Sequence, residues 1–214
     1  MDSLKMDEVK GLVSLLKIRA LENKNYLIEL DSVMGDSDLG LTMAAAFSAL
    51  DEFTASWEDA DIGSMLMKGG MAMSKAAPST MGTLMATGFM RGGKAIKGTE
   101  VIALPELTEF WKAFVGGIMD RGKAKPGEKT IIDALHPVVL SLEQSQYEGA
   151  SLVEASSRAA EAAAEGLEAT KDMVAQHGRA AYYQEKSREI QDPGATMGSL
   201  MVKTFADYIA GRSV

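Results

Sequence analysis

The spacing of apolar residues constrains the fold of this chain more than any other feature. Apolar residues recur three or four positions apart from the start, as they do at Val9, Leu12, Val13 and Leu16. This is the repeat of a helix that buries one face, and no segment shows a convincing period-two alternation of a β-strand. The pattern continues through about eight segments with short connections between them. The sequence therefore predicts an all-α fold, an eight-helix antiparallel barrel or bundle that runs up and down.

Capping residues and prolines predict several helix boundaries. Ser79 and Thr80 can cap a helix that runs to about Lys94. Pro105 suits a first helical position, in a helix that ends near Gly122. A helix from Thr130 contains Pro137, which we expect to kink it. Two helices, or one kinked helix, precede residue 31, and the remaining helices are predicted over residues 43–53, 62–73, 152–169 and 197–209.

Length and composition narrow the class of protein. The 214 residues show no compositional break, which favours one domain over residues 1–214. The 22 basic and 30 acidic residues give a net charge of −8, which argues against a nucleic-acid or anionic-membrane partner. The absence of cysteine excludes disulfides and zinc–thiolate sites. The start of the chain lacks the apolar core of a signal peptide, and no apolar run approaches about 18 residues, so we expect a cytoplasmic protein.

Three carboxylates lie within eight residues of one another, at Asp31, Asp36 and Asp38. Neighbours two or five apart on a regular helix point in different directions, so the backbone must leave the helix for these groups to share an ion. Gly35 and Gly40 supply the required freedom. Hard oxygen ligands suit Mg²⁺ or Ca²⁺. A solvated turn is the alternative, because Asp, Ser and Gly are ordinary turn residues.

The acidic stretch does not match an EF-hand. Counting from Asp36 places Leu41 where the calcium loop needs glycine and Phe47 where it needs a bidentate glutamate. A second partial motif, residues 88–95, looks like a phosphate-binding P-loop but has Ala95 where serine or threonine should bind Mg²⁺. Helix, not strand, is predicted before it. A glycine-bearing helix end is the favoured interpretation of that stretch.

Three further joints carry unusual residues, at residues 76–82, 121–130 and 178–194, and in an up-and-down bundle such joints can gather at one end. Ser79 and Thr80 could bind an anion at a helix start, or could simply cap the helix. Arg179 could clamp a phosphate, and Asp192-Pro193-Gly194 fixes a tight turn with exposed backbone groups. A surface arginine and a helix-initiating turn are the alternatives there. His136 and His177 are the only histidines, which leaves little material for a histidine-based metal or catalytic site.

Taken together and in this order, these segments resemble the DhaL family, the nucleotide-binding (ADP-binding) subunit of phosphotransferase-system-dependent dihydroxyacetone kinases. The resemblance rests on LDSVMGDSDLGLTM at 30–43, RGKAKPGEKTIIDALHP at 121–137, GRAAYYQEKSREIQDPGA at 178–195 and, more weakly, SKAAPSTMGT at 74–83. It implies an eight-helix antiparallel barrel in which Asp31, Asp36 and Asp38 hold two Mg²⁺ ions. It further implies contacts to the phosphates or nucleotide of ADP or ATP from Leu39, Gly40, Leu41, Thr42, Ser79, Thr80, Met81, Gly122, Ile131, Arg179, Asp192, Pro193 and Gly194.

The resemblance also implies an activity. The bound nucleotide would transfer its phosphoryl group to dihydroxyacetone or a similar short ketose on a separate DhaK-type subunit, and a DhaM-type phosphohistidine protein would rephosphorylate ADP in place. No residue of this chain is expected to do covalent catalysis, and Arg179 would act as a phosphate clamp. A homodimer is a further option. The alternatives are a kinase component that exchanges ATP and a nucleotide-sensing adaptor without transfer activity.

The chain departs from the family pattern at a few positions. Leu39 stands where the family commonly has histidine, Thr42 where it has asparagine, and Lys186 where it often has arginine. The stretch around Ala77-Pro78-Ser79 replaces a Ser-Gly-Pro-like loop. A leucine side chain cannot donate a hydrogen bond, so only the backbone of Leu39 could serve a phosphate.

Overall fold

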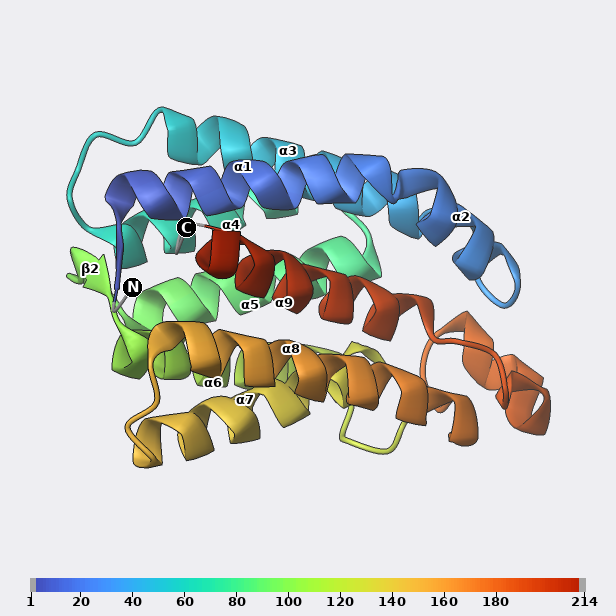
Figure 1. Cartoon of the computed structure of the whole chain (residues 1–214). Coiled ribbons are helices and arrows are strands. Elements are labelled where there is room, and N and C mark those ends of the chain that lie inside the picture. The colour runs from blue at the N-terminus through green and yellow to red at the C-terminus, as the bar shows by residue number, and fades with distance from the viewer. Residues whose placement is uncertain (1–2, 212–214) are drawn as a thin grey trace.

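The computed structural model describes residues 3–211 and shows an all-α protein, which confirms the predicted fold class (Figure 1). Residues 1–2 and 212–214, at the ends of the predicted domain, lie outside the described residues. The α-helices are α1 (Met6–Glu22), α2 (Lys24–Ser32), α3 (Leu39–Ala55), α4 (Ile62–Ala76), α5 (Thr80–Ala95), α6 (Leu104–Gly122), α7 (Ile131–Tyr147), α8 (Leu152–Ala169) and α9 (Pro193–Gly211). Two 3₁₀ helices, η1 (Thr170–Asp172) and η2 (Arg179–Ser187), and two short strands, β1 (Leu4–Lys5) and β2 (Val101–Ile102), complete the described elements.

The helices form a closed ring. Each helix from α3 to α8 packs against the helices before and after it, and α9 packs against both α8 and α1. Helices α1 and α2 are almost continuous, because the N–H of Asn23 donates to the carbonyl of Arg19 and the N–H of Leu27 donates to the carbonyl of Asn23. Counted together they are the one kinked helix that the sequence allowed. The described chain then consists of eight rods that run alternately up and down (Figure 1).

Local side-chain chemistry sets the helix ends. The hydroxyl of Ser79 accepts the N–H of Gly82 at 3.1 Å and caps α5, and the hydroxyl of Thr130 accepts the N–H of Ile132 at 3.2 Å and caps α7. Two helices begin four residues earlier than the sequence predicts, α3 at Leu39 and α9 at Pro193. Gly40 and Gly194, near the two starts, lower the helix propensity there. The helices nevertheless begin directly after Asp38 and Asp192.

Glycines let α5 approach its neighbours closely. An added Cβ at Gly88 would lie 2.7 Å from the ring of Phe114, and one at Gly92 would lie 2.7 Å from the ring of Phe110, both on α6. On the α4 side, a Cβ at Gly93 would lie 2.6 Å from the carbonyl oxygen of Gly63. The P-loop-like stretch 88–95 therefore lies inside α5, where its glycines serve helix packing. This confirms the interpretation favoured from the sequence.

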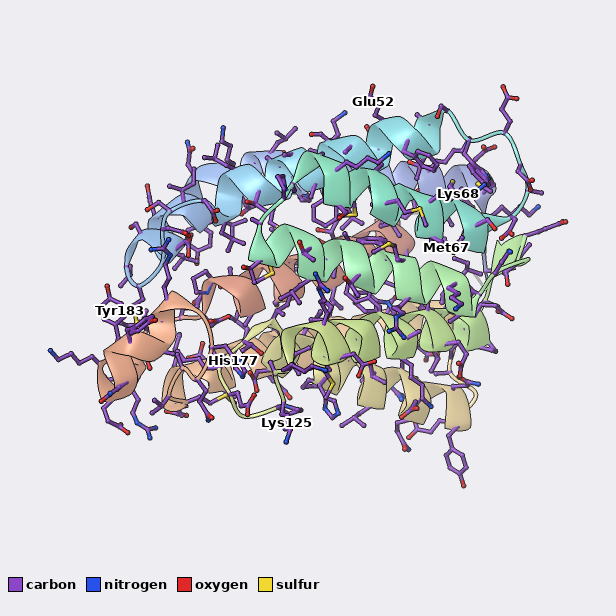
Figure 2. The ribbon with its side chains drawn as sticks, turned by 180° about the vertical axis from the view of Figure 1, so that it is seen from behind. Glu52, Met67, Lys68, Lys125, His177 and Tyr183 are labelled. Carbon is purple, nitrogen blue, oxygen red and sulfur yellow. The ribbon has the colours of Figure 1, made fainter. Side chains whose placement is uncertain are left out.

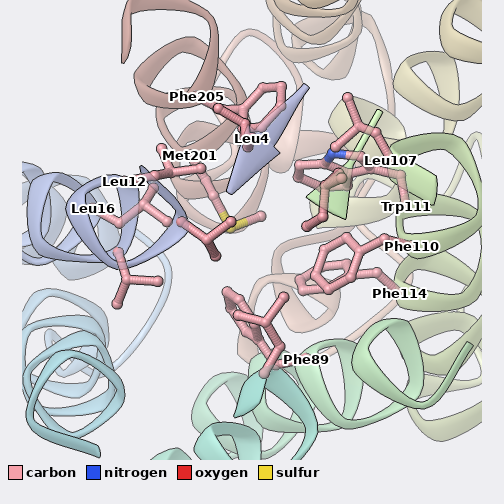
Figure 3. Close-up of a pocket in the computed structure, with 14 residues that line it drawn as sticks. Leu4, Leu12, Leu16, Phe89, Leu107, Phe110, Trp111, Phe114, Met201 and Phe205 are labelled. Atoms are coloured by element: carbon pink, nitrogen blue, oxygen red, sulfur yellow. The ribbon is translucent and has the colours of Figure 1, made fainter. Parts of the chain in front are cut away.

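The interior of the ring is apolar. Aromatic and aliphatic side chains, mainly from α1, α6 and α9, surround a cavity of about 60 Å³ (Figure 3). Strands β1 and β2 pair antiparallel, with Leu4 opposite Ile102, and both side chains line the same cavity. These strands were not predicted, because two residues are too few to show a period. Within residues 3–211, no helix combines the length and the apolar character needed to cross a membrane.

Candidate functional site

Four connecting segments gather at one end of the barrel. They follow α2, α4, α6 and α8, and the up-and-down path of the chain brings all four to the end opposite β1 and β2 (Figure 1). These are the four joints in which the sequence places unusual residues. The sequence alone did not decide whether they meet.

The segment after α2 gathers the three carboxylates. One oxygen atom from each of Asp31, Asp36 and Asp38 lies within 4.8 Å of the other two, so a single ion could reach all three residues. Asp31 lies in the last turn of α2, and its carboxylate accepts the N–H groups of Asp38 at 3.0 Å and Leu39 at 3.3 Å. This aspartate therefore holds the start of α3 against the end of α2. The donor set, three hard oxygens in a polar loop, fits Mg²⁺ or Ca²⁺.

The backbone of this segment departs from a helix as expected. The N–H of Gly35 donates to the carbonyl of Asp31 at 2.6 Å, and an added Cβ at Gly35 would overlap the Asp31 carboxylate. Ser37 adopts a left-handed φ of 63°. Burial raises the pKa of Asp38 above its ordinary value, and the neighbouring charges of Asp36 and Asp31 raise it further. The cluster therefore concentrates negative charge that a cation would relieve.

Arg179 reaches this cluster from the far end of the sequence. Its Nη2 lies 2.9 Å from Oδ2 of Asp36. The arginine stands at the start of η2, in the long segment between α8 and α9, and its side chain is largely exposed. The structure thus brings together the predicted cation ligands and the predicted phosphate clamp. An arginine beside carboxylates is suited to a ligand that carries both a cation and phosphates.

Helix starts surround the same end. Helices α3, α5, α7 and α9 all begin there, and the first N–H groups of a helix lack acceptors within it. Three predicted residues from three of these starts lie close together. An added Cβ at Gly194 would lie 2.9 Å from Cε of Met81 and 3.5 Å from the backbone nitrogen of Ile131. Together the partial positive charges of these helix ends favour an anion, in a chain that is otherwise acidic.

Some predicted contact residues have other partners. The N–H of Leu39 donates to Asp31, while its side chain is buried in the core. The N–H of Thr42 donates to the carbonyl of Asp38, and its side chain is also buried. Leu41 is half exposed. The carboxylate of Asp192 accepts the N–H of Ala195 at 2.6 Å and so caps α9.

The other predicted residues remain at the site end. Gly122 ends α6, where an added Cβ would lie 3.2 Å from Cδ2 of Leu84 on α5. Thr80 is exposed in the first turn of α5, and Gly40 and Pro193 lie in the first turns of α3 and α9. At Gly40 an added Cβ would overlap the carbonyl oxygen of Lys24 on α2. This glycine therefore allows α3 to start in contact with α2.

Three residues in the α6–α7 segment or in the first turn of α7 were missed by sequence reasoning. The carboxylate of Glu128 lies 2.6 Å from Nε2 of His177, and the hydrogen bond from that imidazole lowers the pKa of Glu128. Asp133 accepts the N–H groups of Gly127 at 2.5 Å and Thr130 at 2.7 Å. The pattern Thr-x-x-Asp at 130–133 would have revealed this capping role. Lys129 is almost fully buried, and nothing in its sequence context distinguishes it from a surface lysine.

Comparison with known proteins places these features in a family. The sequence model of the DAK2 domain matches residues 33–207. The chain is 39% identical over 184 residues to the ADP-binding subunit DhaL of the PEP-dependent dihydroxyacetone kinase of Escherichia coli K12, which covers 85% of this chain and 86% of that protein. It is 37% identical to the corresponding subunit of kinase 1 of Listeria innocua, with 86% of each chain covered. An L-erythrulose kinase of Pectobacterium atrosepticum is 31% identical, but the match spans only 30% of that longer protein.

A solved structure shows the same fold. The dihydroxyacetone kinase of C. freundii superimposes with a TM-score of 0.72 at 22% identity, over 93% of this chain and 34% of that one. A second structure of that kinase, in complex with AMP-PNP and Mg²⁺, gives a TM-score of 0.70 at 24% identity. The fold thus recurs as about a third of a larger kinase. From the match to the domain model and the identity to two relatives over most of their length, we conclude that this chain belongs to the DAK2 domain family, alongside the DhaL subunits of dihydroxyacetone kinases.

Proposed function

We propose that this chain is the nucleotide-binding subunit of a dihydroxyacetone (short-ketose) kinase and holds Mg²⁺ with ADP or ATP at the four-segment end of the barrel. The observation that carries the proposal is the meeting of Asp31, Asp36 and Asp38, within 4.8 Å, with Arg179 from a distant segment. The names of the two DhaL relatives, both ADP-binding subunits, support it. A single domain over residues 1–214 and a cytoplasmic location belong to the same proposal.

In this proposal each part of the site has a distinct role. The three carboxylates hold Mg²⁺, two ions in our proposal, and the bound metal neutralises charge on the phosphates. The N–H groups at the starts of α5 and α7, near Met81 and Ile131, bind phosphate oxygens. Arg179 lies beside the carboxylates, so its guanidinium can pass from Asp36 to a phosphate by a small rotation of an exposed side chain.

Phosphoryl transfer requires positioning and charge neutralisation more than covalent chemistry by the protein. The site supplies both, and we assign no nucleophile to this chain. The acceptor is the hydroxyl of dihydroxyacetone or a similar short ketose bound on a separate DhaK-type subunit. A DhaM-type phosphohistidine protein then rephosphorylates ADP in place, as the description of the relatives as PEP-dependent suggests. The nucleotide would therefore act as a resident cofactor.

A second candidate is a kinase component that exchanges ATP with solution. The similarity to two erythrulose kinases favours it, although the matched residues make up only about a third of each of those proteins. An adaptor that senses nucleotide without transfer is the third, and the buried side chain of Leu39 is the feature that motivates it.

Two measurements test these proposals. A native mass spectrum of the purified chain should show ADP and Mg²⁺ retained on the protein, whereas a nucleotide-free spectrum after incubation with Mg-ADP would contradict the nucleotide-binding role. Reconstitution with a DhaK-type subunit and a DhaM-type protein should give phosphoryl flux from phosphoenolpyruvate to dihydroxyacetone. Flux that requires free ATP would favour the exchanging kinase, and bound nucleotide without flux to any short ketose would favour the adaptor. Size-exclusion chromatography of the same mixture tests the assembly and the option of a homodimer.

A further inference from the structure

Three charged side chains are buried in the described part of the chain, and all three lie in one place. Lys129 is 2% exposed, Asp133 5% and Asp192 8%. Lys129 lies in the segment between α6 and α7, with a left-handed φ of 59° that is uncommon for a residue with a side chain. Burying charge is costly unless the charge is paired and hydrogen-bonded. The cost of burying Lys129 in this backbone conformation must therefore be offset by the contacts of its side chain.

The contacts of Lys129 supply that reason. Its Nζ donates to the carbonyl oxygen of Thr170 and, at 2.7 Å, to the carbonyl oxygen of Ile190. Thr170 is where the chain leaves α8, and Ile190 is where it returns toward α9. The two ends of the intervening stretch also touch directly, because the N–H of Glu189 donates to the carbonyl of Lys171 at 2.7 Å. One ammonium group thus closes the neck of a loop that spans residues 171–189.

Nearby carboxylates oppose the cost of burying the Lys129 ammonium. Burial lowers the pKa of Lys129 below its ordinary value and the charge of Arg188 lowers it further, while the carboxylates of Asp192, Asp133 and Asp172 act in the opposite direction. Each carboxylate is itself engaged, Asp192 at the start of α9 and Asp133 at the start of α7. Lys129 is therefore at the junction of two helix starts and both ends of the 171–189 loop.

The loop that Lys129 closes carries Arg179. The side-chain ion pairs of the loop with the rest of the chain lie nearer the surface: the ion pair of Arg179 with Asp36 and the contact of His177 with Glu128 both involve side chains at least a fifth exposed. A backbone bond, from the N–H of Gln176 to the carbonyl of Glu128 at 3.2 Å, joins the loop to the same segment as Lys129. Exposed ion pairs contribute little, whereas hydrogen bonds from a buried charged donor are strong. The buried hydrogen bonds at the neck therefore hold the loop in position more strongly than the exposed ion pairs of Arg179 and His177 do.

We propose that Lys129 is a positioning residue, which closes the neck of the 171–189 loop and thereby holds Arg179 at the carboxylate cluster. The part of this inference that concerns ligand binding rests on the proposed function. Lys129 itself touches no predicted phosphate ligand through its ammonium group, so its effect on binding passes through Arg179.

Hydrogen exchange in the nucleotide-free protein tests the neck without reference to any ligand. Lys129→Met removes the charge and the donors at similar length, and we expect the amides of 171–189 to lose protection while those of α4 to α6 keep theirs. Lys129→Arg retains charge and N–H donors and should restore protection in part. Lys125→Met is the matched control, since Lys125 is exposed in the same segment (Figure 2) and should leave exchange unchanged. Unchanged exchange of 171–189 in Lys129→Met would overturn the proposal.

A double-mutant cycle separates positioning from mere support. By calorimetry with Mg-ADP, Arg179→Gln and Lys129→Met should each weaken binding, by about tenfold for loss of one charge-assisted phosphate contact. The double variant should bind Mg-ADP at most about twofold more weakly than Lys129→Met does, because an arginine that is already displaced contributes little to binding. If the double variant instead loses affinity by the product of the two single losses, Lys129 does not act through Arg179. If the unmodified protein binds no Mg-ADP, the proposed function fails, but the exchange result still decides the role of Lys129.

A measurement on the unmodified protein covers the case in which Lys129→Met does not fold. A buried ammonium held by two carbonyls should exchange its protons slowly enough to give a resolved ¹H–¹⁵N signal. The signal is assigned as the one missing in Lys129→Arg. A Lys129 ammonium that exchanges as fast as the surface lysines would contradict the closed neck.

Discussion

Replacing Asp36 with asparagine tests the cation site most directly. Asp36 and Asp31 contribute differently to the cluster. The Asp31 carboxylate also accepts two backbone N–H groups that hold the loop, whereas Asp36 pairs with the exposed guanidinium of Arg179. Asp36→Asn therefore removes one negative charge and leaves the bonds that shape the loop in place. We expect weaker cation binding with little change in the thermal unfolding midpoint of the metal-free protein.

The size of the effect follows from the charges. A divalent cation about 3 Å from the carboxylate charge gains about 3 kcal/mol even at the dielectric constant of water. In the unmodified protein the cation must compete with Arg179, but an ion pair this exposed offsets at most about 1 kcal/mol. The net loss is therefore about 2 kcal/mol, which corresponds to about 30-fold in the dissociation constant.

Paramagnetic titration with Mn²⁺ measures this loss without any nucleotide. Asp207→Asn is the matched control, because Asp207 is also an exposed aspartate paired with a basic side chain, Lys203, on α9. The control should bind Mn²⁺ like the unmodified protein. If Asp36→Asn binds Mn²⁺ within about threefold of the unmodified protein, the assignment of this cluster as a cation site is wrong.

Three further predictions concern residues at the same end of the barrel. Gly40→Ala should destabilise the protein by about 1–3 kcal/mol, since the new Cβ overlaps the carbonyl of Lys24. Gly116→Ala, with open space around it, should instead stabilise the protein by about 0.5–1 kcal/mol. Equal thermal unfolding midpoints for the two variants would contradict this prediction. Burial raises the pKa of Asp192 from 3.8 to about 6, so its contribution to stability is fully present below pH 3.8 and is lost as the pH rises through 6. The stability of the unmodified protein relative to Asp192→Asn should therefore increase by up to about 3 kcal/mol as the pH falls from about 7 to 4, and a difference in denaturant unfolding free energy that does not vary with pH would argue against the shift. Ser79→Ala leaves the N–H of Gly82 without its acceptor and should cost about 1 kcal/mol, measurable as a lower denaturation midpoint with an unchanged slope.

The helices could be predicted from the sequence because their signals are local. Helix α8 spans the predicted residues, and the caps at Ser79 and Thr130 lie where their side chains indicate. The candidate cation ligands were found for the same reason, since three carboxylates in one short stretch are visible without a fold. Even the false P-loop could be rejected locally, because its glycines stand in a helical context.

The remaining features depend on contacts between distant parts of the chain. Lys129 bonds to carbonyls 41 and 61 residues away, and nothing nearby in sequence marks it as buried. The 3₁₀ helix η2 contains Gln184 with a φ of 49°, a conformation that no propensity would assign to glutamine. The pairing of Leu4 with Ile102 joins two strands too short to recognise. In each case tertiary packing overrides or supplements the local preference.

The closed ring of helices limits how this protein can move. A two-lobed protein can open about a hinge, but here every rod is flanked on both sides, and separating any pair would expose an apolar face along its length. At the proposed nucleotide site, entry and departure would therefore depend on the connecting segments at that end of the barrel, the 171–189 loop among them. We expect the residence time of a bound molecule to follow the local opening of that loop, while the barrel beneath it stays rigid.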